Sequence, residues 1–163
     1  MTTTRRQLLA SSLLLPLTSQ AQTGSQTKLQ SKLRIGFMLP YTGTFAQLGV
    51  AIENGFHLGL KELGGRLGGR EVEFFKVDDE SEPAKAIENA NKLVQRDKVD
   101  VLVGSVHSGV QLGIQKVVRE SGTLSIIPTA AVHAATRSLC APNVFRTSYT
   151  SYQLTHGLGA VML

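Results

Sequence analysis

Short apolar runs alternate with longer segments of helical periodicity over residues 33–163. Five segments of four to seven residues are predicted to be strands: residues 33–39, 71–77, 99–103, 124–127 and 143–147. The second of these alternates rather than forming a continuous apolar run, and the last contains the fewest apolar residues. Between and after these segments, apolar residues recur every three or four positions. This spacing predicts helices over 46–63, from Pro83 onward, from about 110 to Gly122, and over 152–163.

Each predicted helix has one apolar face. The four faces consist of Ile52, Phe56, Leu60 and Leu63; Ala84, Ile87, Ala90 and Val94; Val110, Ile114, Val117 and Val118; and Leu154, Leu158 and Val161. Gly55 and Gly59 lie inside the first helix although glycine is a poor helix former, so we expect close backbone packing there.

The alternation of strand and helix with short connections predicts an α/β fold. We expect a doubly wound parallel sheet covered by helices on both faces, in three α/β/α layers. Ligands of such sheets bind outside the carboxyl ends of the strands. The loops that could form a site are therefore residues 40–49, 78–83, 104–109 and 128–133.

Three of these loops are rich in small and hydroxyl-bearing residues and contain neither lysine nor arginine. The first three loops lead into helix N-termini, whose free N–H groups favour an anion. Backbone N–H groups together with Ser108 and Thr129 could hold a carboxylate, although such residues also serve as caps and turns. His107 is either a site residue or a structural one. For Asp78, Asp79 and Glu80 we favour a helix-capping role over a metal site or a phospho-acceptor cluster.

Several function classes find no support in the sequence. The chain lacks a phosphate-binding GxxxxGK[ST] loop, a GxSxG elbow and an HExxH motif, so we expect neither an enzyme nor a metal or other cofactor. Its formal net charge of +5 is spread among acidic residues, which argues against nucleic-acid binding. Cys140 is the single cysteine and could pair outside this sequence or be a buried free thiol.

The first residues have the pattern of an export signal. Arg5 and Arg6 precede an apolar stretch, and Ser19-Gln20-Ala21 offers a cleavage site, so residues 1–21 are predicted to be a signal peptide of twin-arginine type. Residues 22–32 are polar and predict a flexible lead-in. The expected location of the mature protein is therefore the periplasm.

Four stretches together resemble one family, the periplasmic branched-chain amino-acid-binding proteins of ABC importers. They are IGFMLPYTGTFAQLGVAIENGFHLGLKELGG (35–65), KVDDESEPAKAIENANKLVQRDKVDVLVGSVHSG (76–109), ESGTLSIIPTAA (120–131) and VFRTS (144–148). The resemblance covers roughly residues 33–150. It implies a type I periplasmic binding protein, in which two lobes close on a ligand.

The resemblance also implies site residues. The family's carboxylate-binding serine falls on Ser108, and the groups that follow the fourth strand fall on Thr129, Ala130 and Ala131. The position near the ligand tail falls on Leu48. Ala131 replaces a family threonine. His107 replaces one half-cystine of a family disulfide, whose other half falls on Ser81, and so brings an imidazole beside the pocket.

By this resemblance, residues 33–147 form an incomplete first lobe, and residues 148–163 form the hinge and the first helix of a truncated second lobe. We expect that helix to expose its apolar face. The implied function is a solute-binding component that delivers a ligand to an ABC permease and is monomeric at full length. A branched-chain amino acid is the first expectation for the ligand. An aromatic acid, an amide or urea are alternatives, as is a ligand-sensing receptor domain.

Overall fold

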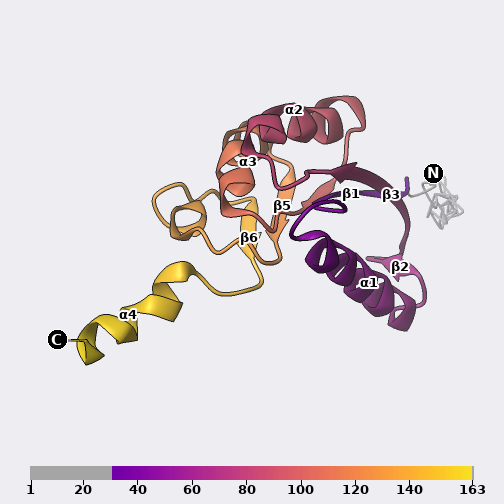
Figure 1. Cartoon of the computed structure of the whole chain (residues 1–163). Helices are drawn as coiled ribbons and strands as arrows, with labels where there is room; N and C mark the ends of the chain where they lie inside the picture. Colours follow the sequence, from indigo (N-terminus) through magenta and orange to yellow (C-terminus); the bar gives the residue numbers. More distant parts are fainter. Residues whose placement is uncertain (1–30, 163) are drawn as a thin grey trace, which may run out of the picture.

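A computed structural model describes residues 31–162, so the predicted signal peptide and all but the last two residues of the lead-in lie outside it. Six strands form one sheet in the order β2-β3-β1-β4-β5-β6 (Figure 1). All pairings are parallel except β2 with β3. The strands are β1 Leu33–Leu39, β2 Arg66–Leu67, β3 Arg70–Asp78, β4 Val101–Val103, β5 Leu124–Ile127 and β6 Val144–Arg146.

The helices follow the predicted alternation. They are α1 Ala46–Glu62, the short 3-10 helix η1 Pro83–Lys85, α2 Ala86–Asn91, the π-helical turn η2 Lys92–Arg96, α3 Ser108–Ser121, the 3-10 helix η3 His133–Thr136 and α4 Ser151–Val161. The α/β fold with a parallel-dominated sheet is therefore confirmed.

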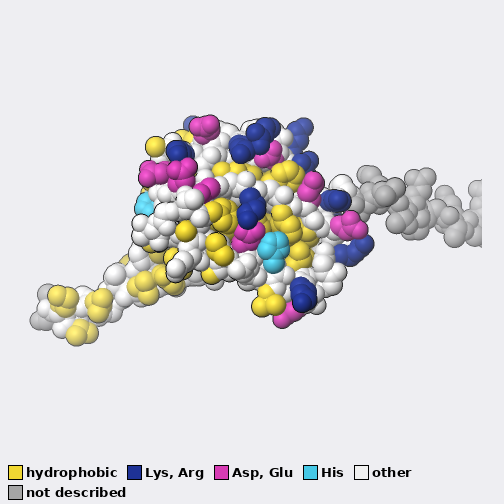
Figure 2. All heavy atoms as spheres, turned by 45° about the vertical axis from the view of Figure 1, so that its right-hand side comes forward, with side chains coloured by type: hydrophobic (Ala, Val, Ile, Leu, Met, Phe, Trp, Pro, Cys, Tyr) yellow, Lys and Arg dark blue, Asp and Glu magenta, His cyan; other side chains and the backbone are white. Residues whose placement is uncertain are grey.

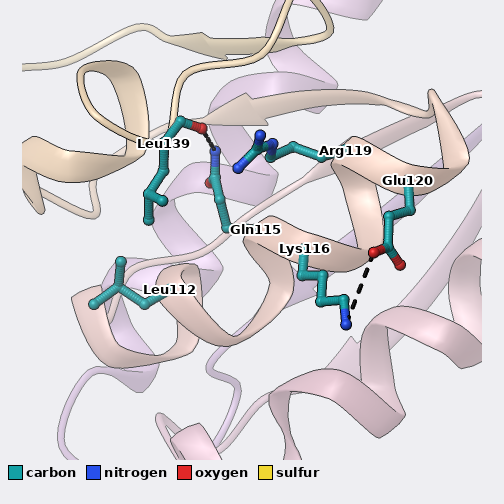
Figure 3. A pocket seen from close by; sticks show the side chains of 6 residues that line it. All are labelled: Leu112, Gln115, Lys116, Arg119, Glu120 and Leu139. Carbon is teal, nitrogen blue, oxygen red and sulfur yellow. Dashed lines mark hydrogen bonds and ion pairs between the residues drawn. The ribbon is translucent and has the colours of Figure 1, made fainter.

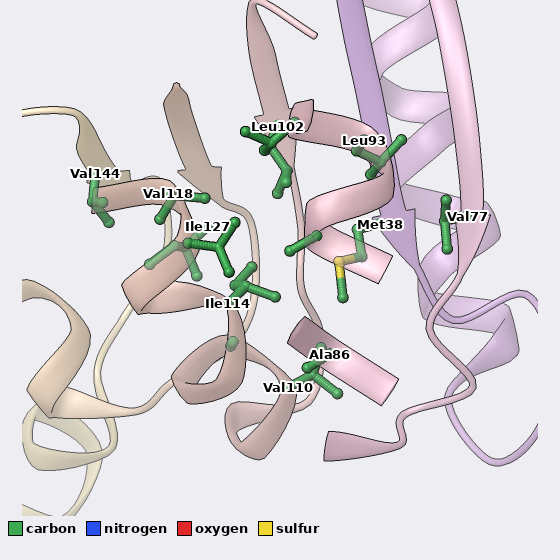
Figure 4. Packing of buried hydrophobic residues seen from close by; sticks show 14 of the residues in the cluster. Met38, Val77, Ala86, Leu93, Leu102, Val110, Ile114, Val118, Ile127 and Val144 are labelled. Carbon is green, nitrogen blue, oxygen red and sulfur yellow. The ribbon is translucent and has the colours of Figure 1, made fainter. Parts of the chain in front are cut away.

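Side chains of β1 alternate between two apolar layers. Ile35, Phe37 and Leu39 point to the side covered by α1, where Phe56 packs against them. Met38 points to the other side, where it joins the side chains of α2 and α3. Figure 4 shows this second layer, in which Leu102 and Ile127 of the sheet face Ala86, Val110, Ile114 and Val118. Two cores on opposite faces of one sheet confirm the three-layer arrangement.

The predicted apolar face of α3 is confirmed, because Val110, Ile114, Val117 and Val118 are all buried. The helix ends at Gly122, whose φ of 71° is a left-handed C-cap. The face predicted after Pro83 is partly wrong. Ala84 and Ile87 are exposed, and Ala86 and Leu93 are buried in their place. A 3-10 turn before α2 and a π turn after it shift the helical phase, so a constant spacing selects the wrong residues.

The glycines of α1 differ from the prediction. A methyl group on Gly55 or Gly59 would meet nothing within 4 Å, so the expected close packing there is wrong. It occurs instead at Gly49, where a methyl group would collide with the carbonyl of Pro40. Leu63 is 63% exposed because it lies beyond the end of α1.

Strand β2 was not predicted from the sequence. Arg66 pairs with Glu71, and Leu67 pairs with Arg70, so Gly68-Gly69 forms the two-residue turn of a hairpin. A glycine pair between two extended segments is a known hairpin signal, but β2 is too short to show alternation. Arg70 also donates to the carbonyls of Ser31 and Lys32, which fixes the end of the lead-in.

Helix α4 projects away from the sheet (Figure 1). Leu154 and Leu158 are each 58% exposed and Val161 is 84% exposed, so the expected exposure of this apolar face is confirmed. Thr150 begins the helix with a capping box that pairs its hydroxyl and backbone with Gln153. The boundary proposed between residues 147 and 148 stays a prediction.

On the face drawn in Figure 2, side chains of one charge do not gather in a single patch. Lysine and arginine side chains lie among acidic ones there, and apolar side chains run along the projecting arm. No helix among residues 31–162 is long and apolar enough to cross a membrane. Cys140 is exposed, so the alternative of a buried thiol is wrong.

Candidate functional site

The loops that follow β1, β4 and β5 meet at the carboxyl edge of the sheet. The N–H of Ala130 donates to the carbonyl of Ser105 over 3.1 Å, which joins the loops after β5 and β4. The rings of Phe45 and His107 lie 6.2 Å apart between centroids, which brings the loop after β1 to the same place. Segments distant in the sequence therefore form one surface, as the parallel topology requires.

His107 caps the N-terminus of α3. Its Nδ1 accepts a hydrogen bond from the N–H of Gly109 over 3.2 Å, and its carbonyl accepts one from the Ser105 hydroxyl over 3.0 Å. The structural role that the sequence left open is thus present. Because the ring is only half-buried and lies beside Phe45, it also forms part of the surface at this edge.

Ser108 is the first residue of α3 and is half-buried. At this end of a 14-residue helix the first backbone N–H groups lack intrahelical partners and carry the positive end of the helix dipole, although that of Gly109 donates to Nδ1 of His107. Its hydroxyl stands beside these groups. Together they can hold the oxygens of an anion.

The three predicted residues after Pro128 differ in their availability. Ala130 is fully buried, and both its N–H and its carbonyl bond within the chain, to Ser105 and Arg146. Thr129 and Ala131 are half-buried. The N–H of Ala131 and the hydroxyl of Thr129 find no partner within residues 31–162, although the Ala131 carbonyl accepts from the N–H of Ser151 over 2.8 Å. These two free groups are the ones a ligand could use.

Leu48 lies on the helix that follows the first loop. It occupies the first turn of α1 and is 45% exposed. The structure thus groups His107, Ser108, Thr129 and Ala131 at one edge and leaves Leu48 on a neighbouring helix. Its predicted contact with a ligand tail stays a prediction.

Asp78 fastens two of the loops together rather than capping a helix. Its carboxylate accepts from the N–H of Tyr41 over 2.9 Å, the hydroxyl of Thr42 over 2.7 Å and the N–H of Glu80 over 2.9 Å. Burial opposes its ionisation, but these hydrogen bonds outweigh that effect and lower the pKa of Asp78. The capping role expected for these acidic residues is wrong, since η1 begins without any side-chain cap.

Asp79 is fully buried beneath the same loop. One oxygen accepts from the N–H of Ser81 over 2.8 Å, and the other has no partner among the described residues. Burial raises the pKa of Asp79 to about 6, with the Ser81 hydrogen bond and the charge of His107 acting in the opposite direction. Among residues 31–162 no three histidine, cysteine, aspartate or glutamate side chains cluster as metal ligands.

The raised pKa of Asp79 predicts a specific pH dependence. The folded protein binds a proton here that the unfolded chain releases near its ordinary value of 3.8, so ionisation costs stability as pH rises toward and through 6. We expect Asp79→Asn to gain stability relative to the wild type between pH 4 and pH 7. Urea unfolding of both proteins across this range measures the difference. A difference that stays constant with pH contradicts the raised pKa.

A well-defined surface hollow lies elsewhere. It has a volume of about 430 Å³ and follows the body of α3, where it is lined by Leu112, Gln115, Lys116, Arg119, Glu120 and Leu139 (Figure 3). Gln115 donates to the carbonyl of Leu139 over 2.9 Å, and Lys116 lies 3.8 Å from Glu120. Its polar groups are thus partly engaged with each other, and it lies away from the N-terminus of α3.

The comparison with known families decides the assignment. A family model described as "Periplasmic binding protein" matches residues 32–163, which is most of the chain. The chain belongs to the periplasmic binding protein family. The fold is that of a type I periplasmic-binding-protein lobe, present here as a partial domain.

Relatives of this periplasmic binding protein include receptors for two ligand classes. A Leu/Ile/Val-binding protein of Rhizobium johnstonii is 34% identical over 117 residues, covering 71% of this chain and 31% of the relative. A solute-binding protein from R. palustris, solved in complex with benzoate, is 50% identical with a TM-score of 0.77, covering 80% of this chain and 36% of that one. This chain spans about a third of the length of these relatives.

A third relative is a solute-binding protein from Rhodopseudomonas palustris BisB5, solved in complex with 3,4-dihydroxybenzoic acid. It is 27% identical with a TM-score of 0.68, covering 73% of this chain and 32% of that one.

Sequence reasoning missed two residues of this edge. Phe45 contributes a ring beside His107, and Arg146 binds the loop that carries Thr129 and Ala131. The absence of any acidic residue from 121 to 163 was a signal for Arg146, because it leaves that cation without a nearby partner in the sequence.

Proposed function

We propose that this chain forms the first lobe of an exported solute receptor that binds a small carboxylate for an ABC importer. The observation that carries the proposal is the hydrogen bond between Ala130 and Ser105, which places the N-terminus of α3 beside the loop after β5. The N–H of Ser108 and the N–H of Ala131 then lie at one edge. Such groups bind carboxylate oxygens without needing a charged side chain.

An aromatic carboxylate is the ligand that we favour. The relative with 50% identity was solved with benzoate. The neighbouring rings of Phe45 and His107 supply flat surfaces against which an aromatic ligand could pack. This order differs from the expectation drawn from sequence, which placed a branched-chain amino acid first.

A branched-chain amino acid is the second candidate, supported by the Leu/Ile/Val-binding relative. Its ammonium group would need an acceptor, and the first three acidic residues of the loop after β3 are already bonded or buried, with Glu80 paired to Lys85. Asp78 is bonded to neighbouring loops, and Asp79 is buried. An acid without an amino group therefore suits this lobe better.

We further propose that the receptor is exported to the periplasm by its twin-arginine-like signal and delivers its ligand to an ABC permease as a monomer. Solute binding without catalysis is the function of the family. The alternative is a ligand-sensing receptor domain of the same fold, which would signal to a partner protein instead of delivering its ligand to a permease.

Ser108→Ala tests the proposed site. We expect the dissociation constant for benzoate to rise about tenfold, because a hydroxyl hydrogen bond to a charged oxygen is lost. Titration of the chain followed by NMR measures this, and we expect weak, millimolar binding because one lobe supplies only part of the contacts. Ser121→Ala, at the exposed opposite end of α3, is the matched control and should leave benzoate binding unchanged. Equal affinities of the two variants would exclude Ser108 from the site.

A further inference from the structure

Arg146, on the last strand of the sheet, binds the loop that carries two of the candidate ligand groups. It donates to the carbonyls of Ala130 through Nη1 and of Val132 through Nη2, the latter over 2.6 Å. Weaker contacts of 3.4 Å reach the hydroxyl of Thr136 through Nε and the carbonyl of Tyr149 through Nη1. One guanidinium therefore holds both carbonyls that flank Ala131.

Within the part of the chain that the structure describes, the charge of Arg146 has no carboxylate partner. No acidic residue occurs between 121 and 163, and none of the ion pairs found within residues 31–162 includes Arg146. The side chain is half-buried, and this burial lowers its pKa from the usual arginine value. An unpaired, half-buried cation thus stands behind the loop after β5.

The peptide group between Ala130 and Ala131 can transmit the influence of this charge to the side where a ligand would bind. The carbonyl of Ala130 and the N–H of Ala131 belong to one trans peptide and point in opposite directions. Because the carbonyl points at the guanidinium, the N–H points away from it. A cation on the carbonyl polarises the peptide and strengthens the N–H as a donor. That N–H has no partner among the described residues.

We propose that Arg146 is a positioning residue that makes this lobe selective for a ligand carboxylate. It fixes the loop through the two carbonyls. Its uncompensated positive charge also polarises the Ala130–Ala131 peptide and so strengthens the N–H of Ala131 as a donor. Arg146 touches no ligand in this account and acts through the N–H of Ala131. The inference rests on the proposed carboxylate site.

Benzoate and its neutral analogue benzamide separate the charge effect from simple folding support. In Arg146→Gln we expect the dissociation constant for benzoate to rise about tenfold and that for benzamide to change less than twofold. Arg146→Lys keeps the charge and should retain most of the preference for benzoate. NMR titration measures all four constants beside those of the wild type. An unchanged ratio in Arg146→Gln, or an equal loss in Arg146→Lys, overturns the proposal.

A second measurement needs no variant and covers the case in which Arg146→Gln does not fold. The Nη protons of Arg146 in the wild type should give resolved NMR signals, because carbonyls hold them, and should shift with benzoate but not with benzamide. If these signals average freely, or respond equally to both compounds, the proposal about Arg146 is overturned while the proposed function stands. The proposed function is tested separately, and it fails if benzoate shifts no amide NMR signal of the loops after β4 and β5 in the wild type.

Discussion

Gly49→Ala is expected to destabilise the protein by about 2 kcal/mol, although alanine is ordinarily the better helix former. Gly49 lies in the first turns of α1 and is buried against the loop after β1. A methyl group there would collide with the backbone carbonyl of Pro40, which cannot rotate away as a side chain can. The helix must shift or the loop must open, and both change the edge where we place the ligand. Urea unfolding monitored by circular dichroism measures the loss.

The same helix supplies matched controls for this substitution. Gly55 and Gly59 face open space, so alanine there should stabilise the protein by up to about 1 kcal/mol through helix propensity alone. The three variants share the element and the chemical change and differ only in what the methyl group meets. If Gly49→Ala proves as stable as Gly55→Ala, the close approach of α1 to Pro40 is wrong.

Phe37→Ala is expected to cost about 3–5 kcal/mol, the largest loss of any single change proposed for this fold. Phe37 is fully buried at the centre of β1. Its ring stacks on Phe74 with centroids 5.4 Å apart and meets the edge of Phe56 at 5.3 Å. Truncation leaves a cavity between the sheet and α1. Because small domains are stable by only about 5–15 kcal/mol, a large unfolded fraction should appear at mild urea concentrations.

Phe145→Ala is the control for this core substitution. Phe145 lies on another strand of the same sheet, β6, and is 54% exposed, so its truncation should cost far less. The comparison keeps the residue types and the sheet constant and changes only burial. Similar losses in both variants would mean that the cluster around Phe37 is not a packed core.

Most of the fold could be predicted from the sequence, because the strands are short, apolar and regularly spaced. β1 and β5 occupy the predicted residues, and α3 buries the predicted face up to Gly122. The predictions were wrong where the local geometry departs from a single helical period or depends on the position of a loop. The 3-10 and π turns around α2 change the helical phase, and packing at Gly49 depends on a loop that periodicity cannot place.

The site was predictable only in part. Parallel topology places the carboxyl ends of neighbouring strands together, which explains why Ser108 and Thr129 could be expected at one edge. Periodicity and composition cannot show that the Ala130 amide is already bonded or that Arg146 binds the loop after the neighbouring strand β5. These features depend on side-chain and backbone orientation in the folded state.

The most direct test of the carboxylate site is a residue-resolved NMR titration of this chain with benzoate. Our account predicts that the amide signals of Ser108 and Ala131 shift together along one binding curve. The residues around the hollow on α3, such as Lys116 and Glu120, should stay unmoved and serve as an internal control. Shifts confined to that hollow, or none at Ser108 and Ala131, would contradict the proposal that this lobe binds a carboxylate at the carboxyl edge of its sheet.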